Sequence, residues 1–103
     1  MTTKRWYGLK DLENKFGSMT IGLFLRAFRE SEELSQVAYS KKLRLSRANL
    51  CDIEKGRKLV SPSRAAKMAK VLGVPPEVLI QLAIQDELRM AHLNYQVELK
   101  KAV

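Results

Sequence analysis

Four hydroxyl residues, each placed directly before a run with helical spacing, divide residues 20–72 into short helices. Serine and threonine at such positions accept hydrogen bonds from the first free amides of a helix. Apolar residues then recur at three- and four-residue intervals within each run. The predicted helices cover 20–33, 36–43, 47–54 and 62–72, and their caps are Thr20, Ser35, Ser46 and Ser61.

The remainder of the chain adds a fifth helix and a change of period. Pro76 opens a helix that is expected to run to about Ala91. Polar residues then alternate with apolar ones, which is the spacing of a β-strand. The apolar positions of this predicted strand are Leu93, Tyr95, Val97 and Leu99.

The expected fold is therefore all-α. A five-helix domain over 20–91 would follow a short N-terminal extension, residues 1–19, and precede a C-terminal β-strand and tail, residues 92–103. The extension carries five large apolar side chains and is expected to hold a short helix near 9–16.

Charge points to a polyanionic partner. The chain has 19 Lys and Arg against 11 Asp and Glu, a net charge of +8. Residues 41–58 contain seven of the basic residues and only two acids. Such clustering is typical of a surface that binds nucleic acid, although a merely soluble basic protein is also compatible with it.

Several other classes of function are not expected. The chain lacks paired carboxylates, a nucleophile with its base, and a phosphate-binding glycine loop, so an enzyme is not predicted. His92 has no second ligand at metal spacing, and no cofactor is indicated. Cys51 is the only cysteine, which excludes an intrachain disulfide. Without a signal core or a long apolar run, a soluble cytoplasmic protein with no membrane partner is expected.

Two short helices joined by Arg44 and Leu45 form a helix-turn-helix, in which the second helix enters the major groove of DNA. Residues 34–58, LSQVAYSKKLRLSRANLCDIEKGRK, resemble the Cro/C1-type (XRE) helix-turn-helix regulators. The resemblance covers 20–82 as a five-helix domain, and residues 16–82 are also similar to antitoxins of bacterial toxin–antitoxin modules. The family usually has glycine at position 44 and a neutral hydrogen-bonding residue at position 52.

The first turn of the second helix should read bases in double-stranded DNA. Ser46 caps it, and Arg47 follows at the end that points into the groove, where a contact to guanine is expected. Ala48 is small enough to contact a thymine methyl, while Asn49 is expected to read adenine or to touch the backbone. The resemblance implies that Gln36 reaches a phosphate and braces this helix.

Cations just beyond the helix should bind phosphates without reading sequence. These are Lys55, Arg57 and Lys58, on either side of the turn at Gly56. Two acids need a separate explanation. The resemblance implies that Glu54 forms a structural ion pair with Arg29. Asp52 would orient Arg47 or Lys55 or lower nonspecific affinity, or alternatively would contact cytosine.

The function indicated is a sequence-specific transcriptional repressor that acts as a homodimer on an inverted repeat and regulates its own operon. An antitoxin that neutralises a ribonuclease-type toxin is the alternative, and a bridging module without its own operator is a third. The dimer is expected to form by antiparallel pairing of the C-terminal strand through Leu93, Tyr95, Val97 and Leu99. Pairing with a toxin or with Trp6 and Tyr7 remains open.

Overall fold

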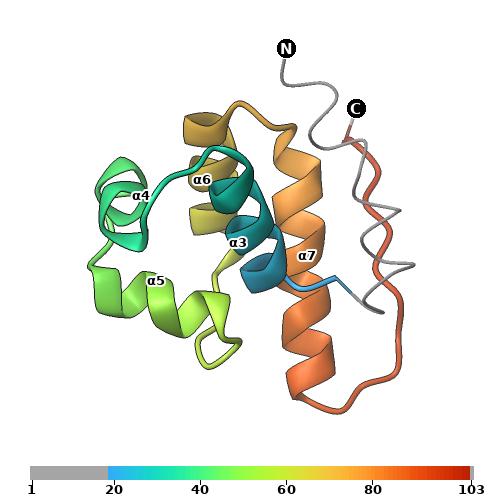
Figure 1. Cartoon of the computed structure of the whole chain (residues 1–103). Coiled ribbons are helices and arrows are strands. Elements are labelled where there is room, and N and C mark those ends of the chain that lie inside the picture. Colours follow the sequence, from blue (N-terminus) through green and yellow to red (C-terminus); the bar gives the residue numbers. More distant parts are fainter. Residues whose placement is uncertain (1–18, 103) are drawn as a thin grey trace.

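The computed structural model describes residues 19–102, and this part of the chain folds into five helices (Figure 1). They are α3 (Ile21–Ser31), α4 (Gln36–Lys42), α5 (Arg47–Glu54), α6 (Pro62–Leu72) and α7 (Pro76–Met90). All five helices expected from the sequence are confirmed, with ends within two residues of the predicted ones. The helix expected near 9–16 lies outside the described residues.

The four predicted caps are present. Each hydroxyl oxygen accepts a hydrogen bond from the amide three residues later, which satisfies one of the free donors of its helix. The pairs are Thr20 with Leu23 (3.0 Å), Ser35 with Ala38 (3.1 Å), Ser46 with Asn49 (3.0 Å) and Ser61 with Arg64 (3.3 Å).

One hydrophobic core joins the helices. In Figure 1, α3 occupies the centre, with α4 and α5 to one side of it and α7 to the other. Helix α3 contacts both α5 and α7, while α6 packs along α7. The largest fully buried side chains come from α3, α4, α5, α7 and the loop before α6, and they are Ile21, Leu25, Tyr39, Leu50, Ile53, Val60 and Leu79. The rotation of α5 about its axis is fixed by this burial.

The turn between α4 and α5 has left-handed geometry at a residue that is not glycine. Arg44 has φ of 57°, and the amide of Leu45 donates to the carbonyl of Ser40 at 2.8 Å. This backbone conformation costs a non-glycine residue about 1 kcal/mol. The chain therefore keeps the turn that glycine usually makes in the resembled family, and it places a cation there.

Helices α3 and α5 approach so closely at Gly22 that a β-carbon would not fit. A Cβ built on Gly22 would collide with the backbone carbonyl oxygen of Ile53 and would lie 3.0 Å from that of Glu54. Gly22 is buried within the first turn of α3. The missing side chain thus sets how deeply the C-terminal end of α5 is seated in the domain.

A buried carboxylate links the start of α3 to α7. Asp86 accepts a hydrogen bond from the amide of Ile21 at 3.1 Å and pairs with Arg89 at 2.8 Å. Only 8% of Asp86 is exposed, and this burial raises the pKa of its carboxyl group, although both partners act in the opposite direction. Asp86 therefore caps a helix from another element.

Replacing Asp86 with alanine is expected to lower the free energy of unfolding by about 1–3 kcal/mol, because the amide of Ile21 loses its buried acceptor. Asp86→Asn should lose less, since the amide oxygen of asparagine still accepts that bond. Urea unfolding at pH 7 measures both losses, with Glu87→Ala, an exposed neighbour, as control. Equal losses for alanine and asparagine would contradict the capping role.

The difference in stability between the wild type and Asp86→Asn should depend on pH. Because the folded-state pKa of Asp86 is raised, its contribution to stability is fully present below the unfolded-state pKa of about 3.9. That contribution is lost as the pH rises through the folded-state pKa. The stability of the wild type relative to Asp86→Asn should therefore fall over this interval.

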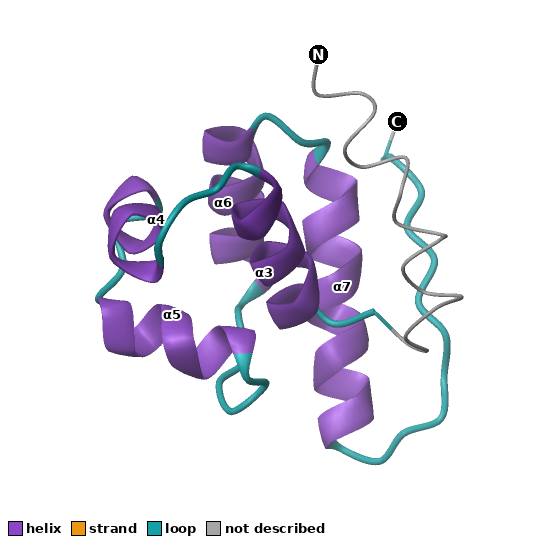
Figure 2. Ribbon diagram, in the orientation of Figure 1, coloured by secondary structure: helices purple, strands orange, loops and turns teal. Residues whose placement is uncertain are grey.

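The predicted C-terminal strand is wrong. Residues 93–102 form no strand, and no strand occurs within residues 19–102 (Figure 2). The side chain of Gln85 instead takes the place of a ladder partner, because its Nε2 donates to the carbonyl of Tyr95 and its Oε1 accepts from the amide of Val97, both at 2.7 Å. The alternation of Leu93, Tyr95, Val97 and Leu99 therefore does not by itself establish a β-strand. A β-ladder needs a neighbouring strand, which the described residues do not supply.

None of the helices in residues 19–102 has the length and apolar character needed to cross a membrane.

Candidate nucleic-acid interface

The first turn of α5 presents its side chains to solvent. Ser46 closes the N-terminus, and the next two residues, Arg47 and Ala48, are exposed, while Asn49 is half-buried. No acidic residue lies in this turn, so the partial positive charge of the helix N-terminus is not neutralised locally. A cationic, solvent-facing helix end of this kind suits a polyanion.

The outer face of α5 continues from this turn toward its C-terminus. Leu50, Ile53 and Glu54 are buried against the domain, which leaves Asp52 half-buried and Lys55 exposed on the other side. Cys51 is also half-buried and is a free thiol. No cluster of three potential metal ligands occurs among residues 19–102.

A left-handed turn brings two loop cations back beside α5. Gly56 has φ of 77°, and the amide of Arg57 donates to the carbonyl of Asp52 at 2.8 Å. The side chain of Arg57 lies 3.4 Å from the carboxylate of Asp52. Lys58 donates to the side-chain oxygen of Asn49 at 2.7 Å. Both cations remain exposed at the edge of the helix face.

The second acid of α5 faces the interior. Glu54 is paired with Arg29 through two bonds, from Nε at 2.8 Å and from Nη2 at 3.1 Å, and its side chain is only 2% exposed. Arg29 also donates to the carbonyl of Leu34 at 3.0 Å. The hydrogen bond to Glu54 is the main reason that the pKa of Arg29 is raised above its ordinary value. The charge of Glu54 is thus compensated within the domain.

Gln36 joins this network from the start of α4. Its Nε2 donates to Oε1 of Glu54 at 3.0 Å, and the side chain is half-buried. The buried phenol of Tyr39 lies on the same helix, and burial is the main cause of its raised pKa. The network connects α3, α4 and α5, so it fixes the relative positions of the two helices of the helix-turn-helix.

Most of the expected DNA-binding residues are brought to one surface. The outer face of α5 and the loop after it are linked directly, through the contacts of Asn49 with Lys58 and of Asp52 with Arg57. The structure pairs Asp52 with Arg57, where the sequence indicated Arg47 or Lys55. Gln36 lies on the inner side of this surface, in contact with Glu54.

Two structurally important residues were missed from the sequence. Gly22 gave no turn signal, because it lies inside a helix and its role depends on the approach of α5. Asp86 was one charged residue on a helix with other charges, and its burial depends on the packing of α3 against α7. The only local hint was a glycine at a position where helix propensity favours alanine.

Comparisons with known proteins agree with this geometry. A family model described as "Helix-turn-helix domain" matches residues 20–82. The immunity repressor protein of Bacillus phage phi105 is 36% identical over 62 residues, a match that covers 60% of this chain and 43% of the phage protein. The chain thus spans less than half the length of this relative. No solved structure matches significantly.

The matched residues include the four capped helices, the left-handed turn at Arg44 and the network around Glu54. Similarity to antitoxins is not shown by these comparisons, whereas the resemblance noted for residues 34–58 is confirmed. The chain therefore belongs to the helix-turn-helix family of Cro/C1-type regulators.

Proposed function

We propose that this protein is a sequence-specific DNA-binding transcriptional repressor that acts as a homodimer on an inverted-repeat operator. The observation that carries the proposal is the exposed first turn of α5 beside the cationic loop of Arg57 and Lys58. Family membership and the similarity to a phage immunity repressor support it.

In this proposal the residues of the surface have two roles. Arg47 and Ala48 extend from the helix end into the groove and contact base edges, and Asn49 joins them when Lys58 moves to a phosphate. Lys55, Arg57 and Lys58 bind the phosphate backbone on the flank of the groove. Gln36 positions the start of α4 against Glu54 and donates its second amide hydrogen to a phosphate of the DNA backbone.

Asp52 acts on Arg57 in this scheme. The exposed pair contributes little to stability, since such contacts are worth at most about 1 kcal/mol. Its effect is on binding: Arg57 must leave the carboxylate, or share it, when it contacts a phosphate. Asp52 therefore lowers affinity for DNA of any sequence more than it alters folding.

A homodimer follows from the small footprint of one helix-turn-helix. A single recognition helix reads only a few base pairs, and two copies related by a two-fold axis place their helices one turn of DNA apart, about 34 Å. Nothing in the described residues favours a toxin as partner, so the antitoxin alternative is not carried further.

Substitution of the cations tests the two roles. Arg57→Ala and Lys58→Ala are each expected to weaken binding to the operator and to random DNA alike, and to lower the salt slope by about one. Arg47→Ala should instead remove about 1–3 kcal/mol of discrimination between them. Fluorescence anisotropy across a salt titration, on an operator selected from random sequences, measures both effects.

Lys100→Ala is the matched control, because Lys100 is an exposed cation on the C-terminal segment, far from α5 in Figure 1. It should leave the salt slope unchanged. If Arg47, Arg57 and Lys58 behave alike, the division into base contacts and phosphate contacts is wrong. If the wild type selects no sequence at all, the bridging-module interpretation replaces the repressor.

A further inference from the structure

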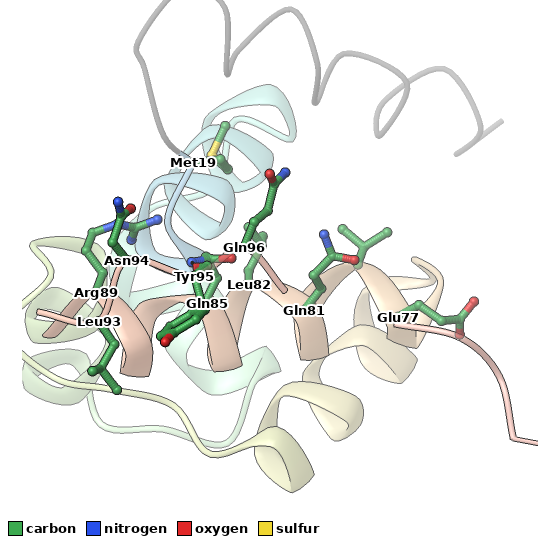
Figure 3. Close-up of a pocket in the computed structure, with 11 residues that line it drawn as sticks. Met19, Glu77, Gln81, Leu82, Gln85, Arg89, Leu93, Asn94, Tyr95 and Gln96 are labelled. Carbon is green, nitrogen blue, oxygen red and sulfur yellow. Dashed lines mark hydrogen bonds between the residues drawn. The ribbon is translucent and has the colours of Figure 1, made fainter. Parts of the chain in front are cut away.

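A groove runs between α7 and the segment that follows it (Figure 3). Its cavity has a volume of about 530 Å³. Val78 and Leu82 line it from α7, Leu93 and Tyr95 line it from the C-terminal segment, and Met19 lines it where the described chain begins. Polar side chains, Gln81 and Gln85 among them, complete its walls. The groove is thus both apolar and polar, as a binding surface for an amphipathic segment would be.

The outer wall of the groove is held in place by specific bonds. Gln85 bonds to the main chain on both sides of Gln96, at Tyr95 and at Val97. The amide of Leu93 also donates to the carbonyl of Leu88, which fixes the reversal after α7. These contacts keep the segment extended beside the helix, so that the groove stays open and does not collapse.

Large apolar side chains on this wall remain uncovered by the described residues. Tyr95 is 71% exposed and Leu93 is 47% exposed. Because Leu93 and Tyr95 line the same groove, they form a contiguous exposed apolar patch, and such patches mark candidate docking surfaces. We therefore expect these two side chains to be covered by another part of this protein or by a partner.

The eighteen residues that precede Met19 supply a suitable occupant. They carry Trp6, Tyr7, Leu9, Leu12 and Phe16 together with six charged residues, so they combine large apolar side chains with charged ones. They also end at the groove, since Met19 is one of its lining residues and Phe16 can be at most about 10 Å from it. Covalent attachment gives this segment an effective concentration of the order of millimolar, which a separate partner would have to match.

We propose that residues 1–18 dock into the groove between α7 and the C-terminal segment, and that Trp6 is buried by this contact. The groove lies on the side of the domain away from α5 (Figure 1), and a segment docked in it would cover the exposed Tyr95. The inference does not depend on the proposed DNA binding, because the groove shares no lining residue with the DNA-binding surface.

Trp6 makes the proposal directly measurable, because it is the single tryptophan of the chain. In the full-length protein, its emission under selective excitation should lie at shorter wavelength than in urea, and acrylamide should quench it several-fold less. Replacing Leu93 and Tyr95 together by serine should move both values toward those of the unfolded chain. Phe16→Ser, which changes the segment and leaves the groove intact, should do the same.

Val71→Ser is the matched control, since Val71 is an equally exposed apolar residue on α6 and lies outside the groove. It should leave Trp6 shielded, and circular dichroism should show that every variant retains its helices. Emission in the wild type equal to that in urea would overturn the proposal. Shielding that disappears on dilution, together with a monomer–dimer equilibrium in sedimentation, would assign the groove to a second copy and would also overturn it.

Operator binding should be unchanged in all the groove variants. Failure of the wild type to recognise any operator would refute the proposed function and leave the docking result standing. Exposed Trp6 with normal operator binding would refute the docking and leave the function standing.

Discussion

Gly22→Ala is expected to destabilise the domain by about 3 kcal/mol, the upper end of the cost of overpacking. The added methyl group would meet the backbone carbonyls of Ile53 and Glu54, which cannot rotate away as a side chain could. Helix α5 would have to move outward, and the buried pair of Arg29 and Glu54 spans the same two helices. For a domain of this size the loss corresponds to a fall in melting temperature of roughly 12–24 °C.

The direction of the change in stability at Gly22 distinguishes two explanations. Alanine inside a helix normally stabilises it relative to glycine by about 0.5–1 kcal/mol. Helix propensity and steric exclusion therefore predict opposite outcomes at Gly22. Thermal unfolding followed by circular dichroism decides between them, and an unchanged or raised melting temperature would show that α3 and α5 are further apart in solution.

Gly73→Ala is an informative control. Gly73 ends α6 with φ of 74°, and a Cβ there would meet nothing within 4 Å. The substitution costs only the backbone strain of a left-handed residue, about 1 kcal/mol. A much larger loss at Gly22 than at Gly73 would separate the close approach of two helices from a conformational requirement.

The helices could be predicted because their determinants are local. A hydroxyl cap and its amide are three residues apart, and a left-handed residue ends its own helix. The helix-turn-helix followed from the spacing of Ser35 and Ser46 and the short connection between them. The resemblance of residues 34–58 then indicated a candidate DNA-binding surface, and it correctly gave Arg29 as the partner of Glu54.

The errors concern contacts between distant segments. Alternation over 93–99 resembled a strand, but whether an extended segment enters a ladder depends on which group lies beside it, and here that group is the side chain of Gln85. The partner of Asp52 depended on how the turn at Gly56 returns the chain to α5. The roles of Gly22 and Asp86 depended on how α3 packs against α5 and α7.

Arg29→Ala is expected to lower the free energy of unfolding by about 3–5 kcal/mol, since it strands the carboxylate of Glu54, of which 2% is exposed. Glu54→Ala should cost less, because Arg29 is 14% exposed and keeps its bond to the carbonyl of Leu34. The double variant should lose less than the sum of the two, since neither charge is then left without its partner.

A second ion pair in the domain serves as the control. Arg26 and Glu30 lie 3.5 Å apart on α3, with side chains 57% and 58% exposed. Solvent screens that pair, so Arg26→Ala and Glu30→Ala should each change stability by only about 0.5 kcal/mol. Urea unfolding of all the single and double variants gives the two coupling energies on one scale.

The same variants show whether Glu54 affects DNA binding directly. Its charge is already paired with Arg29, and Gln36 donates a hydrogen bond to the same carboxylate, so removing it should leave affinity for random DNA nearly unchanged at temperatures well below the melting point. An exposed acid at the same position would instead repel phosphates, and its removal would raise affinity and steepen the salt dependence. Additive stability losses combined with a large gain in affinity would show that Glu54 faces the DNA in solution. A coupled loss of stability at constant affinity would establish that a recognition helix can carry an acid without opposing its polyanionic ligand, provided the acid is turned into the domain and paired there.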